Sequence, residues 1–374
     1  MEIAEYVSRF DEEPGYLDFG YAGPMGRTVR EEVAGLTEMQ ARARFGWQGA
    51  FDEQDSRVRT AVAALSGFPA DQIVFQPNAG TALMHTMFGI TGGVALSAAE
   101  FPAITYAADR AAASLGVLAP TWLETDHGRV TPGELRDQLD PSIVAVAVSL
   151  VDFRTGYLAD LEGIRQVIGD RLLVVDATQA FGVVDAPWRL ADVVVSAGYK
   201  WPRAGWGTGF LALSERALEH LTPVWSGFAG DGGEGLPLDE VRPPASGAAR
   251  FVVSHPDPIA EARLAAALEE IAEVGVGAIN TRLAEQVARI LDLADEFAVP
   301  VASPRAESER AGIVVLQPAA DQLTALAASL HNHGVSTTVR GGSVRLAPHV
   351  STEEETFTML RAALQSFATV RVPA

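Results

Sequence analysis

A series of short apolar runs between residues 72 and 213 constrains the fold of this chain more than any other feature. The stretches between the runs, such as 103–116 and 158–169, carry Ala, Leu and Ile at helical spacing. Continuous apolar strands that alternate with helices are typical of a mostly parallel sheet with helices on both faces. The six runs are QIVF (72–75), VALS (94–97), IVAVAV (143–148), RLLVVD (171–176), ADVVVS (191–196) and GFLAL (209–213).

The character of the sequence changes after residue 240. A loop rich in Gly, Pro and Asp (230–247) leads into a region where helices and short strands predict a smaller α+β domain. We expect a large domain over 15–250 and a small domain over 251–374, with residues 1–14 packing on the small one. The helices are expected at 257–273, 278–296, 320–332 and 352–366, and the strands at 312–316, 335–339 and 343–347.

Composition excludes several classes of function. A formal net charge of −20 disfavours nucleic acid or an anionic membrane as partner. No apolar run approaches the ~20 residues of a membrane helix, and the N-terminus has no secretory pattern, so we expect a cytoplasmic protein. The absence of Cys excludes a thiolate metal site or a Cys nucleophile. His331 and His333 lie just before Gly334. This pattern favours a helix C-terminus over a metal site, because Gly is common just after the last helical residue.

Lys200, in GYKWPRAGWGTG, is the only lysine among 28 basic residues; all the others are arginine. An amine can lose its proton and attack a carbonyl to form an imine, whereas a guanidinium cannot. The alternative is a surface lysine left by chance. However, Lys200 follows the apolar run 191–196, and ligands of such sheets bind where the strands end. The position therefore favours a Schiff-base lysine and a pyridoxal phosphate site.

Two other strand ends carry side chains that suit this cofactor. Asp176 ends the run 171–176 and could pair with a protonated pyridine nitrogen, and Gln179 could bind the phenolic oxygen. The alternative for Asp176 is a helix N-cap. Phe101 follows the run 94–97 and could stack on the ring, or it could be an ordinary core residue.

Two polar groups are candidates for anion binding. The backbone N–H groups of Ala79, Gly80 and Thr81, with the Thr81 hydroxyl, would form an anion site at a helix N-terminus; the alternative is that Asn78 simply caps the helix. Arg345, in a short strand after a Gly pair, could hold a substrate carboxylate with its planar fork, or could be solvated.

Together these motifs resemble the class V aminotransferase family of pyridoxal-phosphate enzymes, from YLDFGYAGPMGRTVREEV (16–33) to VRLAPHVSTEEE (344–355). The resemblance implies fold type I, with a mostly parallel seven-stranded sheet between helices and a smaller C-terminal domain. It implies that Lys200 binds the cofactor, that Asp176, Gln179, Phe101, Gly80 and Thr81 surround it, and that Arg345 and Tyr21 contact the substrate. It also implies a homodimer with active sites at the interface.

Several segments resemble kynureninases within that family, namely EFPAITY (99–106), VWSGF (224–228) and RFVVSHPDP (250–258). This comparison implies that Tyr199, Trp225 and Ser254 help to hold the phosphate. The glutamine at position 179 resembles cysteine desulfurases more than kynureninases. The desulfurase mechanism, however, needs a Cys that this chain lacks. Phe153, in VDFRTG (151–156), stands where desulfurases carry a substrate-facing Asn.

The expected function is therefore a pyridoxal-phosphate enzyme that acts on an amino acid. Lys200 would serve as imine partner and then as the base that moves the α-proton. We expect an aminotransferase first, then a β-lyase that cleaves C–S or C–C bonds, and then an epimerase. A non-catalytic binding protein is disfavoured because such a chain would be expected to lose the amine first.

Overall fold

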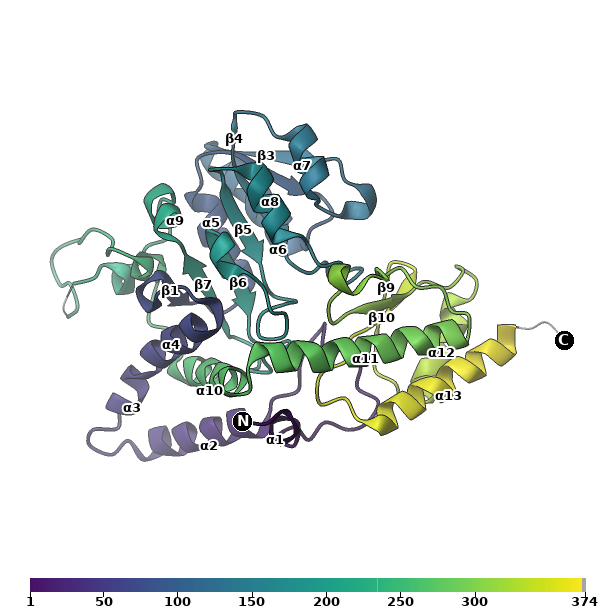
Figure 1. Cartoon of the computed structure of the whole chain (residues 1–374). Coiled ribbons are helices and arrows are strands. Elements are labelled where there is room, and N and C mark those ends of the chain that lie inside the picture. Colours follow the sequence, from purple (N-terminus) through teal and green to yellow (C-terminus); the bar gives the residue numbers. More distant parts are fainter. Residues whose placement is uncertain (234, 372–374) are drawn as a thin grey trace.

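A seven-stranded sheet forms the centre of the larger body of the chain (Figure 1), as the resemblance implied. The structure is a computed structural model, and it describes residues 1–233 and 235–371. The strand order is β1-β7-β6-β5-β4-β2-β3; the two pairs that involve β7 are antiparallel and the other four are parallel. The strands are β1 (Ile73–Phe75), β2 (Gly92–Ser97), β3 (Leu118–Leu123), β4 (Ile143–Ser149), β5 (Leu172–Asp176), β6 (Val193–Ala197) and β7 (Gly209–Leu213).

Strand β3 is the one that the apolar runs did not predict. It lies at the edge of the sheet, pairs in parallel with β2, and is only partly buried. Pro120 interrupts its sequence, and proline in sheets is largely confined to edge strands because it cannot donate to the ladder. An edge strand needs no continuous apolar run, which is why the pattern missed it.

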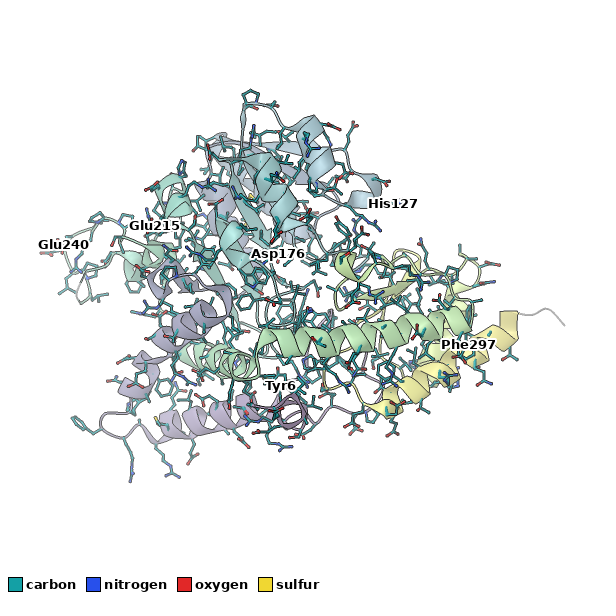
Figure 2. The ribbon with its side chains drawn as sticks, in the orientation of Figure 1. Tyr6, His127, Asp176, Glu215, Glu240 and Phe297 are labelled. Carbon is teal, nitrogen blue, oxygen red and sulfur yellow. The ribbon has the colours of Figure 1, made fainter. Side chains whose placement is uncertain are left out.

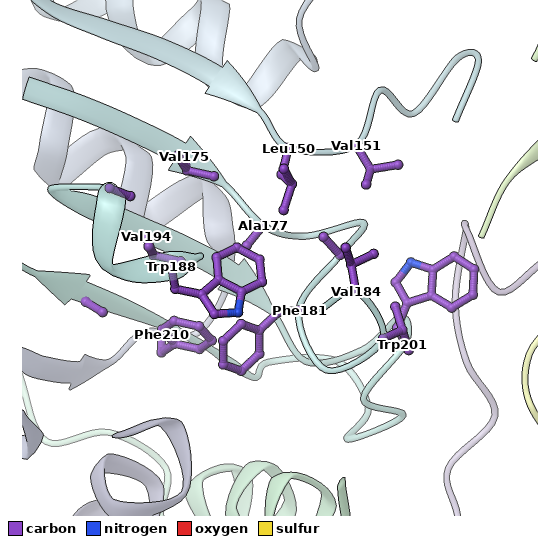
Figure 3. Packing of buried hydrophobic residues seen from close by; sticks show 14 of the residues in the cluster. Leu150, Val151, Val175, Ala177, Phe181, Val184, Trp188, Val194, Trp201 and Phe210 are labelled. Carbon is purple, nitrogen blue, oxygen red and sulfur yellow. The ribbon is translucent and has the colours of Figure 1, made fainter. Parts of the chain in front are cut away.

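Helices cover both faces of the sheet, and the side chains of β5 show how. Leu172 and Val174 pack into a core with α5 and α6, whereas Leu173 and Val175 pack into a second core with α4, α8 and α10. Figure 3 shows part of this second core, where the Phe181 ring lies 4.6 Å from that of Phe210. The helices up to residue 274 are α1 (Ile3–Val7), α2 (Arg27–Arg42), α3 (Gly49–Asp52), α4 (Gln54–Ser66), α5 (Ala79–Gly89), α6 (Pro102–Leu115), α7 (Pro132–Gln138), α8 (Leu161–Ile168), α9 (Glu215–His220) and α10 (Pro258–Val274).

A smaller antiparallel sheet, in the order β8-β10-β9, lies beside three helices and forms a third core with them. The long helix α11 runs from the larger body to this sheet (Figure 1). Helix α12 ends as the sequence predicts, because Gly334 has φ +73° just after it. These elements are α11 (Val276–Glu296), α12 (Leu323–Asn332), α13 (Glu354–Arg371), β8 (Val314–Leu316), β9 (Thr338–Arg340) and β10 (Ser343–Leu346).

The N-terminal region contacts both bodies. Arg9 forms an ion pair with Glu270 of α10 (2.6 Å), and α10 itself packs on α2 and α4. Farther along, Asp18 bridges to Ala347, just after β10. The division of the chain at residue 250, and the packing of residues 1–14 on the small domain, stay predictions.

Candidate active site

Three neighbouring strand ends form one side of a cavity of about 440 Å³. Ser149 ends β4 and is paired in register with Asp176, which ends β5. Lys200 follows β6, the next strand in the sheet. Because parallel strands end at the same edge, residues far apart in sequence meet there. Figure 2 labels Asp176 near the centre of the molecule, between the larger body and the smaller sheet.

The Lys200 side chain is buried in this cavity, with 5% of its surface exposed. Burial lowers the pKa of its amine to about 8, while the negative charge of Asp176 acts in the opposite direction. Its Nζ lies 5.4 Å from the centroid of the Phe101 ring and 5.7 Å from that of Tyr199. The lone lysine is therefore an amine that can be neutral close to physiological pH.

Asp176 lies on the same cavity and is also 5% exposed. Its Oδ1 accepts a hydrogen bond from Thr178 N (2.8 Å), and the chain after it forms turns over residues 178–183. The alternative of a helix N-cap is thus not what the structure has. Burial raises the pKa of Asp176, and the nearby Lys200 charge lowers it. A cationic ligand in the cavity would therefore stabilise the charged form of this carboxylate.

Gln179 lines the cavity with its side chain already oriented. Trp201 Nε1 donates to Gln179 Oε1 (2.9 Å), and Gln179 Nε2 donates to Gly20 O (2.9 Å). Since an amide NH₂ has two hydrogens, one N–H stays available to an acceptor. The segment around Gly20 therefore helps to set the direction in which Gln179 donates.

The N-terminus of α5 divides its residues between two cavities. Ala79 and Gly80 line the cavity of Lys200, but Thr81 and Ser254 line a neighbouring cavity of about 770 Å³. Asn78 caps the helix by accepting from Thr81 N (2.8 Å), so the capping interpretation is what the structure has. The free N–H groups at this helix end still favour an anion.

Two aromatic pairs form parts of the cavity wall. The Phe101 and Phe153 rings meet edge to face with centroids 5.1 Å apart. The Tyr199 and Trp206 rings are stacked, with centroids 4.0 Å apart and an interplanar angle of 18°. All four residues line the cavity, so its walls are largely apolar.

Like Thr81 and Ser254, three further residues expected at the site do not line this cavity. Arg345 is buried, and its Nη2 donates to Thr338 Oγ1 (3.1 Å) and lies 3.4 Å from Asp18 Oδ1. Tyr21 is 55% exposed and packs against the edge of Trp206 (6.1 Å). Trp225 packs on His85 (5.4 Å) and Phe88 (5.0 Å) instead. Their expected roles stay predictions.

Sequence reasoning missed several residues of the cavity, among them Ser149, Thr178 and Trp206. Ser149 directly follows the run IVAVAV, so its place at a strand end was a usable signal. Trp206 stands between two glycines in AGWGTG, but nothing in the sequence indicates that it stacks on Tyr199. Thr178 was visible only as part of the motif around Asp176.

A further carboxyl group lies just outside the cavity. Glu100 Oε2 accepts from Ser149 N (3.1 Å) and from Ser149 Oγ (2.5 Å). Burial raises the pKa of Glu100 to about 7, although these hydrogen bonds act against the rise. Glu100 thus fixes the side chain of Ser149 where it lines the cavity.

The residues around the cavity fit pyridoxal phosphate. The Oδ1 atom of buried Asp176 accepts the bond from Thr178 N, so Oδ2 can pair with a pyridinium nitrogen. The pKa of Lys200 is lowered to about 8, so its amine can be neutral near that pH and form an imine. Thr178 lines the same cavity, and hydrogen bonds from its side chain and backbone favour the charged form of Asp176. Phe101 offers a ring face beside the amine.

Comparisons with known proteins show the family of the chain. The family model for class V aminotransferases matches residues 41–371. A kynureninase from Deinococcus radiodurans is 30% identical over 208 residues; the match covers 53% of this chain and 50% of that protein, so it spans about half of each.

Solved structures share the fold at low sequence identity. The apo cysteine desulfurase from Thermococcus onnurineus NA1 superimposes with a TM-score of 0.87 at 22% identity and covers 99% of both chains. A cystine C–S lyase in complex with cysteine persulfide gives a TM-score of 0.84 at 20% identity and covers 94% of this chain and 97% of its own. None of the helices in residues 1–233 and 235–371 has the length and apolar character that crossing a bilayer requires.

Proposed function

The chain belongs to the class V aminotransferase family of pyridoxal-phosphate enzymes, and from this premise we propose that it is a β-lyase of amino acids. The proposed reaction breaks the C–S or C–C bond that joins the β-carbon of an amino acid to an apolar or aromatic side-chain group. For a C–S bond, the sulfur leaves with the electron pair and takes up a proton; for a C–C bond to a carbonyl carbon, water adds to that carbonyl and the β-carbon keeps the electron pair. The observation that carries the proposal is the buried Lys200 amine facing Asp176 and Phe101 in one cavity.

The cofactor, when bound, supplies an electron sink for the carbanion at the substrate α-carbon. Lys200 Nζ would bind it and would later accept and return the α-proton, which a pKa of about 8 allows near neutral pH. Asp176 would hold the ring nitrogen, Gln179 the phenolic oxygen, and Phe101 one ring face. Ala79 and Gly80 would hold the phosphate with their backbone N–H groups.

A lyase is supported over transamination, which the sequence placed first, by the kynureninase relative. The apolar cavity walls support a substrate with an apolar or aromatic side chain. Phe153 stands where desulfurases carry a substrate-facing Asn and meets Phe101 edge to face, so it offers an apolar contact in place of a polar one. A charged side chain would lose its hydration there without gaining a partner.

Arg345 is the residue proposed to bind the substrate carboxylate, and its present hydrogen-bond partners show which contacts the substrate would have to replace. Its Nη1 donates only at 3.3 Å to Phe153 O, and its Nη2 is shared between Thr338 and Asp18. A substrate carboxylate would have to replace part of this set. We further propose a homodimer, supported by the exposed ring of Trp206, which lines the cavity, and by the exposed Tyr21, which packs on Trp206.

The test is the visible absorbance of the purified protein with added pyridoxal phosphate, followed by a panel of amino acids. Wild type is expected to develop a Schiff-base band, whereas Lys200→Arg keeps a cation but cannot form the imine. Release of alanine or pyruvate with the band restored supports a lyase. Accumulation of the amine form of the cofactor would instead establish transamination, and absence of the band from wild type would overturn the whole assignment.

A further inference from the structure

Arg203 lies three residues after Lys200 and is among the most deeply buried side chains of the protein, with 1% of its surface exposed. Its guanidinium forms a two-pronged ion pair with Glu12: Nη2 lies 2.6 Å from Oε2 and Nη1 lies 3.1 Å from Oε1. Such fork-to-fork pairs fix the orientation of both partners. This pair joins the lysine loop to the N-terminal segment.

The same guanidinium also contacts the small domain and the core. Nη1 donates to Ser351 Oγ (3.0 Å), and Nε donates to Pro24 O. Its Cζ lies 3.8 Å over the centroid of the Phe10 ring. Burial, with the nearby Arg203 charge, holds the pKa of His349 well below its usual range, so that ring stays neutral beside Arg203.

The backbone at Arg203 adopts a conformation that arginine disfavours. Its φ is +61°, in the left-handed region, while its N–H donates to Lys200 O (3.1 Å). A non-glycine residue is strained in this conformation, which persists only where the surrounding structure imposes it. The bonds to Glu12, Ser351 and Pro24 are surroundings of that kind.

Segment 12–24 therefore meets the lysine loop through close contacts of backbone as well as side chain. Gly23 N donates to Tyr199 O (2.8 Å). A Cβ on Gly23 would lie 2.2 Å from Lys200 O and 2.7 Å from Arg203 Cγ. Within residues 1–233 and 235–371, Lys200 Nζ makes no hydrogen bond, so the position of its amine depends on the backbone of this loop.

We propose that Arg203 is a positioning residue: its ion pair with Glu12 and its bonds to Pro24 and Ser351 hold the loop so that Lys200 Nζ faces the cofactor cavity. Arginine meets this need because one planar group reaches acceptors on three residues, whereas lysine is a point charge. The proposal rests on the proposed function only in that pyridoxal phosphate is the partner of Lys200.

Lys200 is the only side chain with a primary amine, and mapping separates its adduct from any adduct at the N-terminal amine. The full chain is mixed with pyridoxal phosphate, reduced with borohydride at timed intervals, and mapped by mass spectrometry for the adduct at Lys200. A second readout, without cofactor, is the rate at which Lys200 reacts with trinitrobenzenesulfonate. Urea unfolding of each variant measures stability in parallel.

Three variants distinguish the effect of the ion pair from the effect of the backbone conformation at residue 203. Arg203→Gly adopts φ +61° readily but removes the guanidinium, Arg203→Lys keeps charge without the fork, and Glu12→Gln keeps shape without charge. Arg165→Lys is the matched control, since Arg165 is largely buried in an ion pair with Asp192 (2.6 Å) that lies away from the lysine loop.

We expect each of the three variants to slow adduct formation at least tenfold and to change the rate of the cofactor-free reaction. Arg165→Lys should react as wild type does, even where its urea midpoint falls equally. Wild-type rates in Arg203→Gly and Glu12→Gln would overturn the positioning role. Failure of wild type itself to form the adduct would instead overturn the proposed function, so the two failures are distinguishable.

Discussion

Asp176 and Lys200 face one cavity from neighbouring strands, and burial shifts the pKa of each toward its neutral form. Burial raises the pKa of the carboxyl and lowers that of the amine to about 8, while each charge opposes the shift of the other. The pair thus keeps Lys200 close to the point where its amine loses the proton. Both roles proposed for Lys200, nucleophile and base, need that neutral form.

Replacement of Asp176 by Asn should therefore lower the pKa of Lys200 further below about 8, because the negative charge that raises it is gone. The pH dependence of borohydride-trapped adduct formation measures this. In wild type the rate should rise with pH up to a midpoint near 8, and in D176N the midpoint should lie lower. Asp126→Asn, on an exposed side chain, is the control. An unchanged midpoint in D176N would contradict the proposed coupling.

Phe153 is expected to select the substrate. Phe153→Ala removes the ring that meets Phe101, so kcat/KM for apolar or aromatic amino acids should fall roughly 10- to 200-fold, the range for lost apolar contacts (about 1–3 kcal/mol). Affinity for pyridoxal phosphate should change little. Phe228→Ala, whose ring packs on His255 (5.3 Å) and does not line the cavity, should leave kcat/KM unchanged. Equal losses for all substrates would refute a selective role.

His85 is expected to make stability depend on pH. The ring is 2% exposed, both its nitrogens lack partners among the described residues, and burial lowers its pKa to about 4. The unfolded state then binds more protons between pH 6.5 and 4, so the wild type loses stability as pH falls through that range.

His85→Leu removes this effect. Relative to wild type, its free energy of unfolding should rise by about 2 kcal/mol between pH 8 and pH 5, as measured by urea unfolding at both values. Met84→Leu, in the same helix and without a titrating group, should show no such change. A pH-independent difference for His85→Leu would rule out a buried neutral imidazole.

Gly23 is expected to tolerate no side chain. Gly23→Ala places a Cβ 2.2 Å from Lys200 O, so the chain must shift at the lysine loop. We expect a loss of roughly 2–4 kcal/mol in unfolding free energy or a loss of cofactor binding. Gly35→Ala, within α2 and with nothing within 4 Å of its Cβ, should instead stabilise by up to about 1 kcal/mol. Unaltered cofactor binding and stability in Gly23→Ala would contradict the close approach.

Much of the fold is determined by local sequence. The apolar runs predict six of the seven central strands, because a strand buried on both faces must be apolar throughout. The same rule places Asp176 and Lys200 at strand ends that meet, and the lone lysine indicates which position needs an amine. The edge strand β3 escapes this rule since it is buried only in part.

Tertiary structure alone decides the relations between segments far apart in the chain. Arg345 lies beside Asp18, Arg203 beside Glu12, and Trp206 on Tyr199. Thr81 and Gly80 are neighbours in sequence yet line different cavities. Periodicity reports only whether a side chain faces the core; its partner there is set by how sheet, small domain and N-terminal segment pack, which no local pattern encodes.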